Sequence, residues 1–274
     1  MSASSFSPIN SRDNPLIKDL RRLASDATAY RRLGSYWIEG DHLCRAAVDK
    51  GLVPKIAVFS ESFWASGHVQ WSGFATKNIV IPDPLFDDLS GLGSASGLGF
   101  LVNLPIHQKV HPHMASVILD RLQDAGNVGS VLRSAAAFGF SQVIALKGSA
   151  ALFSPKVLRA GMGAHFGLTL IESAEPEVLS ALQMPLVVTS SHSGEFLNEV
   201  AFSGRLPDPC AWVLGHEGQG IDSTLVGRAG LCVRIAQPGG EESLNVAAAA
   251  AICLYTSATS GAVTSGPVRG GPPL

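Results

Sequence analysis

A short polar stretch near the end of the chain carries the residue types most suited to chemistry. It reads Ile235-Ala236-Gln237-Pro238-Gly239-Gly240-Glu241-Glu242-Ser243-Leu244-Asn245-Val246. A predicted strand, 231–235, which is apolar except for Arg234, precedes it, and an alanine-rich run with high helix propensity, 247–251, follows it. The glycine-rich loop would therefore deliver two acids, Ser243 and Asn245 to the head of a helix. Ser243 alone could be a helix cap, but this concentration of polar groups indicates a ligand site.

Two further polar segments also follow apolar runs. They are Asn127-Val128-Gly129-Ser130-Val131-Leu132-Arg133 and Leu214-Gly215-His216-Glu217-Gly218-Gln219-Gly220-Ile221. In the first, Asn127 is a candidate N-cap, and Arg133 can lean back toward the helix head and meet a phosphate. Purely structural roles are the alternatives to a ligand site. Asn127 could be a plain helix cap, Arg133 could form a surface ion pair, and the second segment could be a tight glycine turn. A zinc helix at His216-Glu217 is excluded because no second histidine follows and glycines oppose a helix.

The other apolar runs predict the elements that position these segments. Continuous apolar strands, expected when helices cover both faces of a mainly parallel sheet, lie at 117–119, 142–146, 168–171, 186–189, 212–214 and 231–235. The first third also alternates, with helices at 16–33, 41–48 and 83–89 and strands at 36–38, 56–59, 79–81 and 100–104. We therefore expect two α/β domains, 1–107 and 108–256, and a disordered tail at 257–274.

The composition narrows the class of protein. The net charge is −2 and only 15% of residues are charged, so there is no overall basic excess of the kind that nucleic-acid binders show. Between Arg12 and Arg32, however, six basic residues stand against three aspartates, which is either a solvated face or a phosphate-binding one. The four cysteines form no Cys-x-x-Cys pair. No signal peptide or membrane-spanning run is evident, so a reducing cytoplasm is expected.

The three segments, in this order and each after a strand, resemble motifs 1 (127–133), 2 (214–221) and 3 (235–246) of the SpoU (TrmH-type) branch of the SPOUT RNA methyltransferases. The resemblance covers residues 115–256. It implies a C-terminal trefoil knot, a homodimer and transfer of a methyl group from S-adenosylmethionine to a ribose 2′-hydroxyl of RNA. The N-terminal part resembles the family's substrate-binding domain, which has a ribosomal-protein-like α/β fold, and 154–160 resembles a segment of the RNA-facing region.

The resemblance also assigns roles to individual residues. The catalytic set is Asn127, Arg133, Glu217, Ser243 and Asn245. The cofactor set is Thr189, Ser190, Leu214, Gly215, Gly220, Ile235, Gln237, Ser243 and Leu244. The RNA-binding set is Arg21, Arg22, Arg31, Arg32, Lys156 and Arg159, and no metal is expected. Arg133 would clamp a phosphate and polarise the hydroxyl, since a guanidinium is a poor base. A role for Arg133 as the proton acceptor stays open.

Two positions depart from the family pattern. Ala236-Gln237 stands where Pro-Met is usual, which is expected to alter the wall of the adenine pocket. Gly161 stands where serine is common, which is expected to weaken one RNA contact.

The identity of the RNA stays open at this point. The extra N-terminal domain favours ribosomal RNA over tRNA. A non-catalytic RNA-binding protein on the same scaffold is the main alternative, although the complete set of motif residues argues against it. A nucleotide-dependent oxidoreductase is disfavoured because no Gly-x-Gly-x-x-Gly follows a strand. A serine hydrolase using Ser193 or His192 lacks the Gly-x-Ser-x-Gly elbow.

Overall fold

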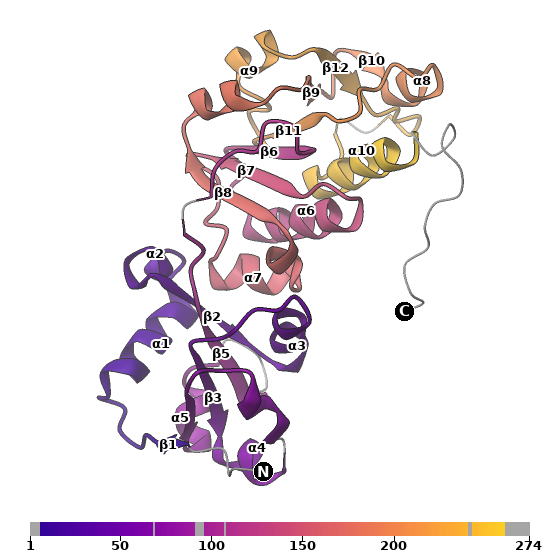
Figure 1. Ribbon diagram of the computed structural model, residues 1–274. Helices are drawn as coiled ribbons and strands as arrows, with labels where there is room; N and C mark the ends of the chain where they lie inside the picture. The colour runs from indigo at the N-terminus through magenta and orange to yellow at the C-terminus, as the bar shows by residue number, and fades with distance from the viewer. Residues whose placement is uncertain (1–5, 68, 91–95, 107, 241–242, 261–274) are drawn as a thin grey trace. The chain divides into compact units, whose positions relative to one another are not determined.

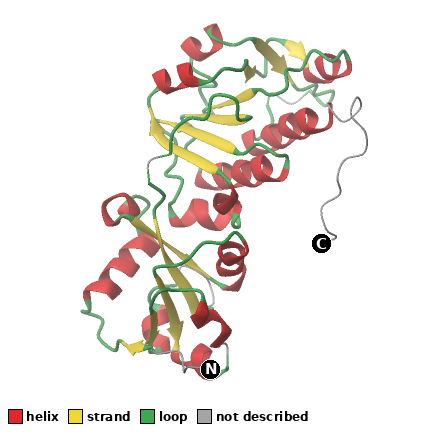
Figure 2. Ribbon diagram, in the orientation of Figure 1, coloured by secondary structure: helices red, strands yellow, loops and turns green. Residues whose placement is uncertain are grey.

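The computed structural model describes residues 6–67, 69–90, 96–106, 108–240 and 243–260. They divide into two compact units, Met1–His107 with Ala151–Gly167 and Gln108–Ala150 with Leu168–Leu274. Strands and helices alternate in both units (Figure 2). The segment 151–167 thus packs with the first unit, whereas the sequence places it in the second domain.

The first unit contains a mixed five-stranded sheet in the order β1-β4-β3-β5-β2. Strand β5 is antiparallel to β2 and β3, and the other pairs are parallel. The strands are β1 (Ser7–Pro8), β2 (Ser35–Glu39), β3 (Ile56–Ser60), β4 (Asn78–Ile81) and β5 (Leu98–Asn103). The helices are α1 (Pro15–Ser25), α2 (Ala29–Leu33), α3 (Asp41–Asp49), α4 (Glu61–Ala65), α5 (Asp83–Asp87) and α7 (Pro155–Gly161), with short 3-10 turns η1 (Val69–Gly73) and η2 (Ala164–Gly167).

The predicted helix 16–33 is two helices. Helix α1 ends where Asp26 takes an extended conformation. The Asp26 carboxylate accepts hydrogen bonds from the backbone N–H and the hydroxyl of Thr28, at 2.8 and 3.1 Å. This side chain to backbone turn competes with the helical hydrogen bonds, so the chain bends before α2 begins.

Aromatic packing explains why 151–167 belongs to the first unit. The Phe153 ring lies 5.8 Å from that of Tyr30 and 5.0 Å from that of Tyr36, measured between ring centroids. All three side chains are buried. Ser154 then caps α7, accepting a hydrogen bond from the Val157 amide. Burial of this aromatic cluster stabilises α7 against the first sheet.

His165 is the buried titratable group of this segment. Its Nε2 hydrogen-bonds the Leu152 carbonyl at 2.9 Å, and its Nδ1 is buried without a hydrogen-bond partner among the described residues. Removal from water disfavours the charged imidazolium and lowers the pKa of His165 to about 4, and the Leu152 contact opposes this only in part.

The stability of the protein should therefore fall when the pH drops below about 6.5. Below that pH His165 binds a proton in the unfolded state but stays neutral in the folded state. The contribution of neutral His165 to the free energy of unfolding is therefore fully present above pH 6.5 and is lost toward pH 4. Between pH 7.5 and pH 5 the loss from this residue should be about 2 kcal/mol. Urea unfolding at both pH values would measure it. His165→Gln should show a markedly smaller difference, and an equal one would contradict the assignment.

The second unit is built on a seven-stranded sheet in the order β10-β12-β9-β11-β6-β7-β8, in which every neighbouring pair is parallel. This confirms the prediction of a mainly parallel sheet. The strands are β6 (Ser116–Asp120), β7 (Gln142–Leu146), β8 (Thr169–Ala174), β9 (Leu186–Thr189), β10 (Glu195–Phe196), β11 (Ala211–Gly215) and β12 (Leu231–Arg234). The two-residue β10 was not expected.

Helical elements cover both faces of this sheet, as the continuous apolar strands require. They are α6 (Ala125–Ala137), α8 (Leu197–Phe202), α9 (Ser223–Gly227), α10 (Val246–Ser260) and the 3-10 turn η3 (Pro176–Ala181). Helices α6 and α10 lie side by side (Figure 1), and the Trp212 indole N–H reaches the hydroxyl of Ser257 on α10 at 2.9 Å. The other face packs Ile118, Ile144 and Val213 with Leu179 of η3 and Leu225 of α9.

Helix α10 continues to Ser260, so the first four residues of the predicted tail are helical. The rest of that tail, 261–274, lies outside the described residues. None of the described helices combines the length and the apolar character needed to cross a bilayer.

Candidate active site

The three motifs meet at the carboxyl edge of the parallel sheet. Motif 1 follows β6, motif 2 follows β11 and motif 3 follows β12. Strand β11 pairs with β6, with Gly215 opposite Asp120. Because all these strands are parallel, their following loops emerge at one edge, where α/β proteins bind ligands.

A chain of side-chain hydrogen bonds joins all three motifs. The Asn245 amide nitrogen (Nδ2) donates to Asn127 Oδ1 at 3.0 Å, and Asn127 Nδ2 donates to Glu217 Oε1 at 3.2 Å. The Glu217 carboxylate also accepts from the backbone amides of Gln123 and Asp124, at 3.5 and 3.4 Å. Three of the five residues predicted to be catalytic are therefore in direct contact, although they are up to 118 positions apart.

The direction of each bond in this chain is fixed by the helix that carries Asn245. Asn245 Oδ1 accepts from the amides of Ala247 and Ala248, at 2.9 and 3.3 Å, in the first turn of α10. Its Nδ2 must then face Asn127 and donate, which makes Asn127 Oδ1 an acceptor and leaves its Nδ2 to donate to the carboxylate. The head of α10 thus orients the whole chain of contacts.

Glu217 is ionised in this arrangement. Partial burial alone would raise its pKa, but hydrogen bonds from its own amide, from Asn127 and from the amides of Asp124 and Gln123 outweigh that effect and lower the pKa. Since Glu217 is also exposed to solvent, a negative charge stands at the mouth of the site at neutral pH.

The structure corrects the two predicted caps. Helix α6 begins at Ala125, and Asp124, not Asn127, is its N-cap, accepting from the Asn127 amide at 2.7 Å. Asn245, not Ser243, makes the capping bonds of α10. The Asn127 side chain is thereby free to join the network, and Asn245 joins it through Nδ2 while its Oδ1 caps α10. Ser243 is exposed at the site's edge, and Glu241 and Glu242 lie outside the described residues.

Arg133 lies two turns into α6 on its exposed face. The surrounding residues of α6 that are buried, Val131, Leu132 and Ala135, point into the core. No hydrogen bond or ion pair links the Arg133 guanidinium to any residue that the structure describes. Its five donors therefore face solvent and can bind an anion without breaking an internal contact.

The residues predicted to bind the cofactor lie at the carboxyl ends of β9 and β11 and on the loops after β9, β11 and β12, which are neighbours in the sheet. Thr189 pairs with Val233, so the ends of β9 and β12 are in register. Gly215 allows the motif 2 loop to fold back, because a Cβ there would lie 2.5 Å from the backbone of Gly220 and of Ile221. Further along the same edge lie Ser190, Leu214, Ile235 and Leu244.

Gln237 carries an unsatisfied group on the loop after β12. Its Oε1 is buried and has no hydrogen-bond partner among the described residues. A buried acceptor without a donor is costly, so this atom needs a hydrogen-bond donor from outside the described residues.

The predicted RNA-binding residues differ in how free they are. Arg21 and Arg22 of α1 lie 3.9 and 3.6 Å from the carboxylates of Asp88 and Asp19, and Arg31 contacts the Tyr30 hydroxyl. No ion pair among the described residues engages Arg32, Lys156 or Arg159. The charge near the N-terminus is thus largely compensated, and α2 and α7 carry the available cations of this set.

The departure at Gly161 has a different meaning from the one expected. Gly161 is buried, and a Cβ there would lie 2.5 Å from Cε1 of the His165 ring. A serine side chain would collide with the imidazole and would not point toward a ligand. The glycine therefore makes room for the buried histidine.

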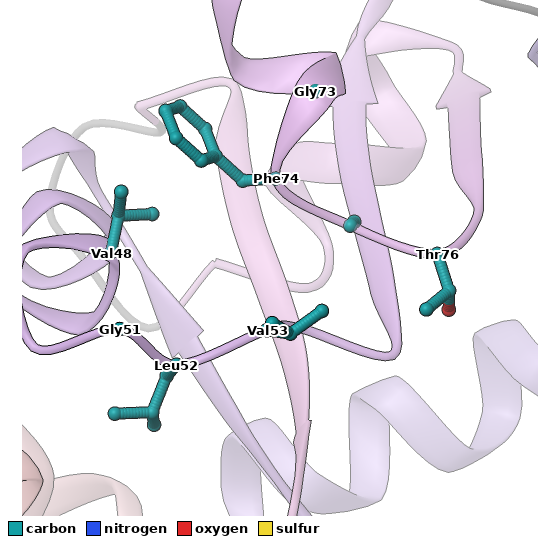
Figure 3. A pocket seen from close by; sticks show the side chains of 8 residues that line it. Val48, Gly51, Leu52, Val53, Gly73, Phe74 and Thr76 are labelled. Carbon is teal, nitrogen blue, oxygen red and sulfur yellow. The ribbon is translucent and has the colours of Figure 1, made fainter.

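A shallow apolar hollow of about 320 Å³ lies in the first unit, between the end of α3 and the segment after η1 (Figure 3). Its lining includes Val48, Leu52, Val53 and Phe74, and no residue of the three motifs lines it.

The described residues contain no cluster of His, Cys, Asp and Glu that could hold a metal ion. His216 Nδ1 accepts from the amides of Gly218 and Gln219 and so shapes its own loop.

Sequence reasoning missed two residues beside the network. Asp120 is buried, and its carboxylate binds the guanidinium of Arg121 and the amide of Asp222. The signal was present, because a strand that ends in an acidic and a basic residue just before motif 1 offers an ion pair to the neighbouring loop.

A parallel sheet whose carboxyl-end loops share one polar network defines an α/β protein that binds a ligand at that edge. The model of the SpoU rRNA Methylase family matches residues 114–255, more than half of the 274 residues. The chain therefore belongs to this family.

Individual relatives agree with this assignment. The 23S rRNA (guanosine(2553)-2'-O)-methyltransferase RlmP of Bacillus subtilis is 27% identical over 90% of this chain and 97% of its own length. The 23S rRNA (guanosine-2'-O-)-methyltransferase RlmB of Bordetella pertussis is 34% identical over 52% of this chain and 58% of its own. A solved RNA 2'-O ribose methyltransferase is 28% identical, with a TM-score of 0.73 over 93% of this chain and 99% of that one.

Proposed function

We propose that this protein is an RNA ribose 2′-O-methyltransferase that uses S-adenosylmethionine and acts on ribosomal RNA. The observation that carries the proposal is the hydrogen-bonded chain Asn245–Asn127–Glu217, which unites the three family motifs at one edge of the sheet. Membership of the SpoU family and the activities in the names of RlmP and RlmB support the reaction and the ribosomal substrate.

The mechanism follows from what each side chain can do. S-adenosylmethionine would supply the methyl group: the carbon–oxygen bond would form opposite the breaking carbon–sulfur bond, leaving S-adenosylhomocysteine and releasing the hydroxyl proton. Because the three atoms must be in line, positioning should supply much of the rate. Arg133 would bind the neighbouring phosphate through its planar fork of donors and polarise the hydroxyl. Asn127, Glu217 and Asn245 would orient the ribose and the phosphate, with the exposed Ser243 hydroxyl beside them.

The residues at the sheet edge fit the cofactor. The buried Oε1 of Gln237 requires a donor, and the exocyclic amine of adenine is one. Close packing of Gly215 against the motif 2 loop brings backbone amides and carbonyls near the same edge. To the cofactor site we assign Thr189, Ser190, Leu214, Gly215, Gly220, Ile235, Gln237, Ser243 and Leu244.

Gln237 should therefore let the protein recognise the adenine amine. The wild type should bind S-adenosylhomocysteine about five- to tenfold more tightly than its analogue that lacks the 6-amino group, the value of one hydrogen bond. Gln237→Met, which restores the usual family residue, should bind the two compounds alike. Calorimetry measures all four constants, and an unchanged preference in the variant would refute the role.

The first unit is proposed to bind the RNA. Helices α2 and α7 are brought together by the Tyr30–Phe153 contact. They carry Arg31, Arg32, Lys156 and Arg159, whose positive charge can contact phosphates. Arg21 and Arg22 can join them only by giving up their pairing with aspartates. A ribosomal substrate agrees with the expected cytoplasmic location.

We further infer the knot and the dimer of the family. Strand β12 lies on the far side of β9 from β11, while α10 returns to pack on α6 and β11, and this return supports the inference of a knot. Such threading is rare outside knotted folds. The first ten residues of α10, 246–255, are apolar, yet Ile252 and Tyr255 are 40% and 56% exposed. A second copy covering this face would bury them.

Transfer of labelled methyl from S-adenosylmethionine to total cellular RNA tests the proposal. Label in ribosomal RNA, at linkages resistant to alkali, would establish the activity, since 2′-O-methylation blocks alkaline cleavage. Label in tRNA would keep the reaction and overturn the substrate. Absence of both label and cofactor binding would favour a non-catalytic RNA-binding protein.

A further inference from the structure

At the end of β6, Asp120 and Arg121 form an ion pair that is hydrogen-bonded to the motif 2 loop. The guanidinium of Arg121 binds both oxygens of the Asp120 carboxylate, at 2.9 and 3.0 Å. From this fixed position Arg121 donates to Gln219 Oε1 at 3.1 Å and to the Gly220 carbonyl at 3.4 Å. Asp120 accepts the amide of Asp222 at 2.7 Å. The pair therefore contacts three residues of the loop that carries Glu217.

The surroundings of the pair make it rigid. The Asp120 side chain is 4% exposed and that of Arg121 31%, so neither is screened as a surface pair would be. Arg121 has a φ of 58°, a left-handed conformation that is disfavoured for a residue with a side chain. Its stem lies over Gly148, where a Cβ would come 3.2 Å from Arg121 Cγ. Such a local cost is retained where the placement of a side chain matters.

The loop needs this support because Glu217 is held weakly from its other side. The three bonds that the Glu217 carboxylate accepts from motif 1 and the residues before it are 3.2 to 3.5 Å long. A loop free to shift by an ångström would break them.

We propose that Arg121 is a positioning residue, which holds the motif 2 loop so that Glu217 stays within reach of Asn127. Its kinetic consequence rests on the proposed methyltransferase function. Its structural consequence does not, so the two can be tested separately.

The structural arm is hydrogen exchange of the loop amides in Arg121→Lys. Lysine keeps the charge beside Asp120 and the same backbone strain but lacks the fork that reaches Gln219 and Gly220. Amides of 216–222 should exchange at least about tenfold faster than in the wild type, since exchange reports local opening. Gln219→Ala, which changes an exposed side chain, should act in the same direction. Unchanged exchange in both variants would overturn the proposal, whether or not the protein methylates RNA.

The kinetic arm asks whether Arg121 acts through Glu217. Arg121→Lys should lower kcat on the order of tenfold, the effect of a small misplacement. In a Glu217→Gln background it should change kcat by less than about twofold, because coupled residues are not additive. An equal loss in both backgrounds would mean a general structural role and would refute the proposal.

Arg205→Lys is the matched control for both arms. Arg205 makes a similar two-bond pair with Glu195, at 3.0 and 2.6 Å, on the exposed surface of the same unit and outside the motif 2 loop. It should leave loop exchange and kcat unchanged. If the wild type binds S-adenosylhomocysteine but methylates no RNA, while Arg121→Lys still loosens the loop, the proposed function fails and the positioning role stands.

Discussion

Replacing Arg133 with alanine should lower kcat for RNA methylation by at least about a hundredfold, the loss seen when a charge-stabilising donor is removed. The guanidinium is exposed and contacts no described residue through a hydrogen bond or ion pair, so the folded state should lose little by the change. The melting temperature and the affinity for S-adenosylhomocysteine should therefore stay close to those of the wild type. Single-turnover methylation with saturating RNA would measure the chemical step.

Two variants give this result its meaning. Arg133→Lys keeps the charge but not the planar fork, so it should recover only a small part of the rate. Arg228→Ala removes an exposed arginine of the same unit whose contact is the Pro176 carbonyl, and it should be neutral. Near-normal turnover by Arg133→Ala would exclude the clamp, and equal losses in both alanine variants would point to a general effect of surface charge.

Asn245→Asp should separate the stability of α10 from the chemistry of the site. Aspartate caps a helix as well as asparagine does, and its charge is favourable at the helix N-terminus, so the melting temperature should be equal or higher. The carboxylate, however, cannot donate to Asn127 Oδ1. If the Asn127 amide turns over to donate to it, an oxygen then faces the Glu217 carboxylate, so one contact is lost either way. We expect kcat to fall between about tenfold and a hundredfold.

Asn245→Ala is the comparison that completes this test. It should lose the same activity and in addition about 1 kcal/mol of stability, because the cap is gone. Thermal unfolding and methyl-transfer rates of both variants would be measured together. Full activity in Asn245→Asp would show that the contact with Asn127 is dispensable, and the network would lose its proposed role.

Some residues of the site can be identified from the sequence and others cannot. Glu217 and Asn245 stand out in the sequence because glycine-rich or polar surroundings are poor places for packing. Arg121 does not stand out, because its importance comes from a loop that is about a hundred residues away in the chain. Gln237 was marked by its departure from the family pattern, and its buried Oε1 gives that departure a physical meaning.

The sequence by itself determined the elements and the motif residues. Continuous apolar runs predict buried parallel strands, and the six expected in the second unit are present. Local preference was less reliable at boundaries: the Asp26 turn divides a predicted helix, and Asp124 takes the cap expected of Asn127. In both cases the error has a local cause. A polar side chain can hydrogen-bond a nearby backbone amide instead of leaving the helix intact, and several polar residues near a helix start can each make the capping bond.

Only the tertiary structure decided which strand ends meet and which side chains touch. The order β12-β9-β11-β6 brings loops far apart in sequence to one edge, and no local pattern specifies that order. The tertiary structure also shows that Gly161 makes room for His165 and that α7 packs with the first unit. A hydrogen bond between Asn245 and Asn127 depends on positions set to within a fraction of an ångström by the packing of α10 on α6. Residue types can predict the chemistry of such a contact, but only the packed core fixes its distance and direction.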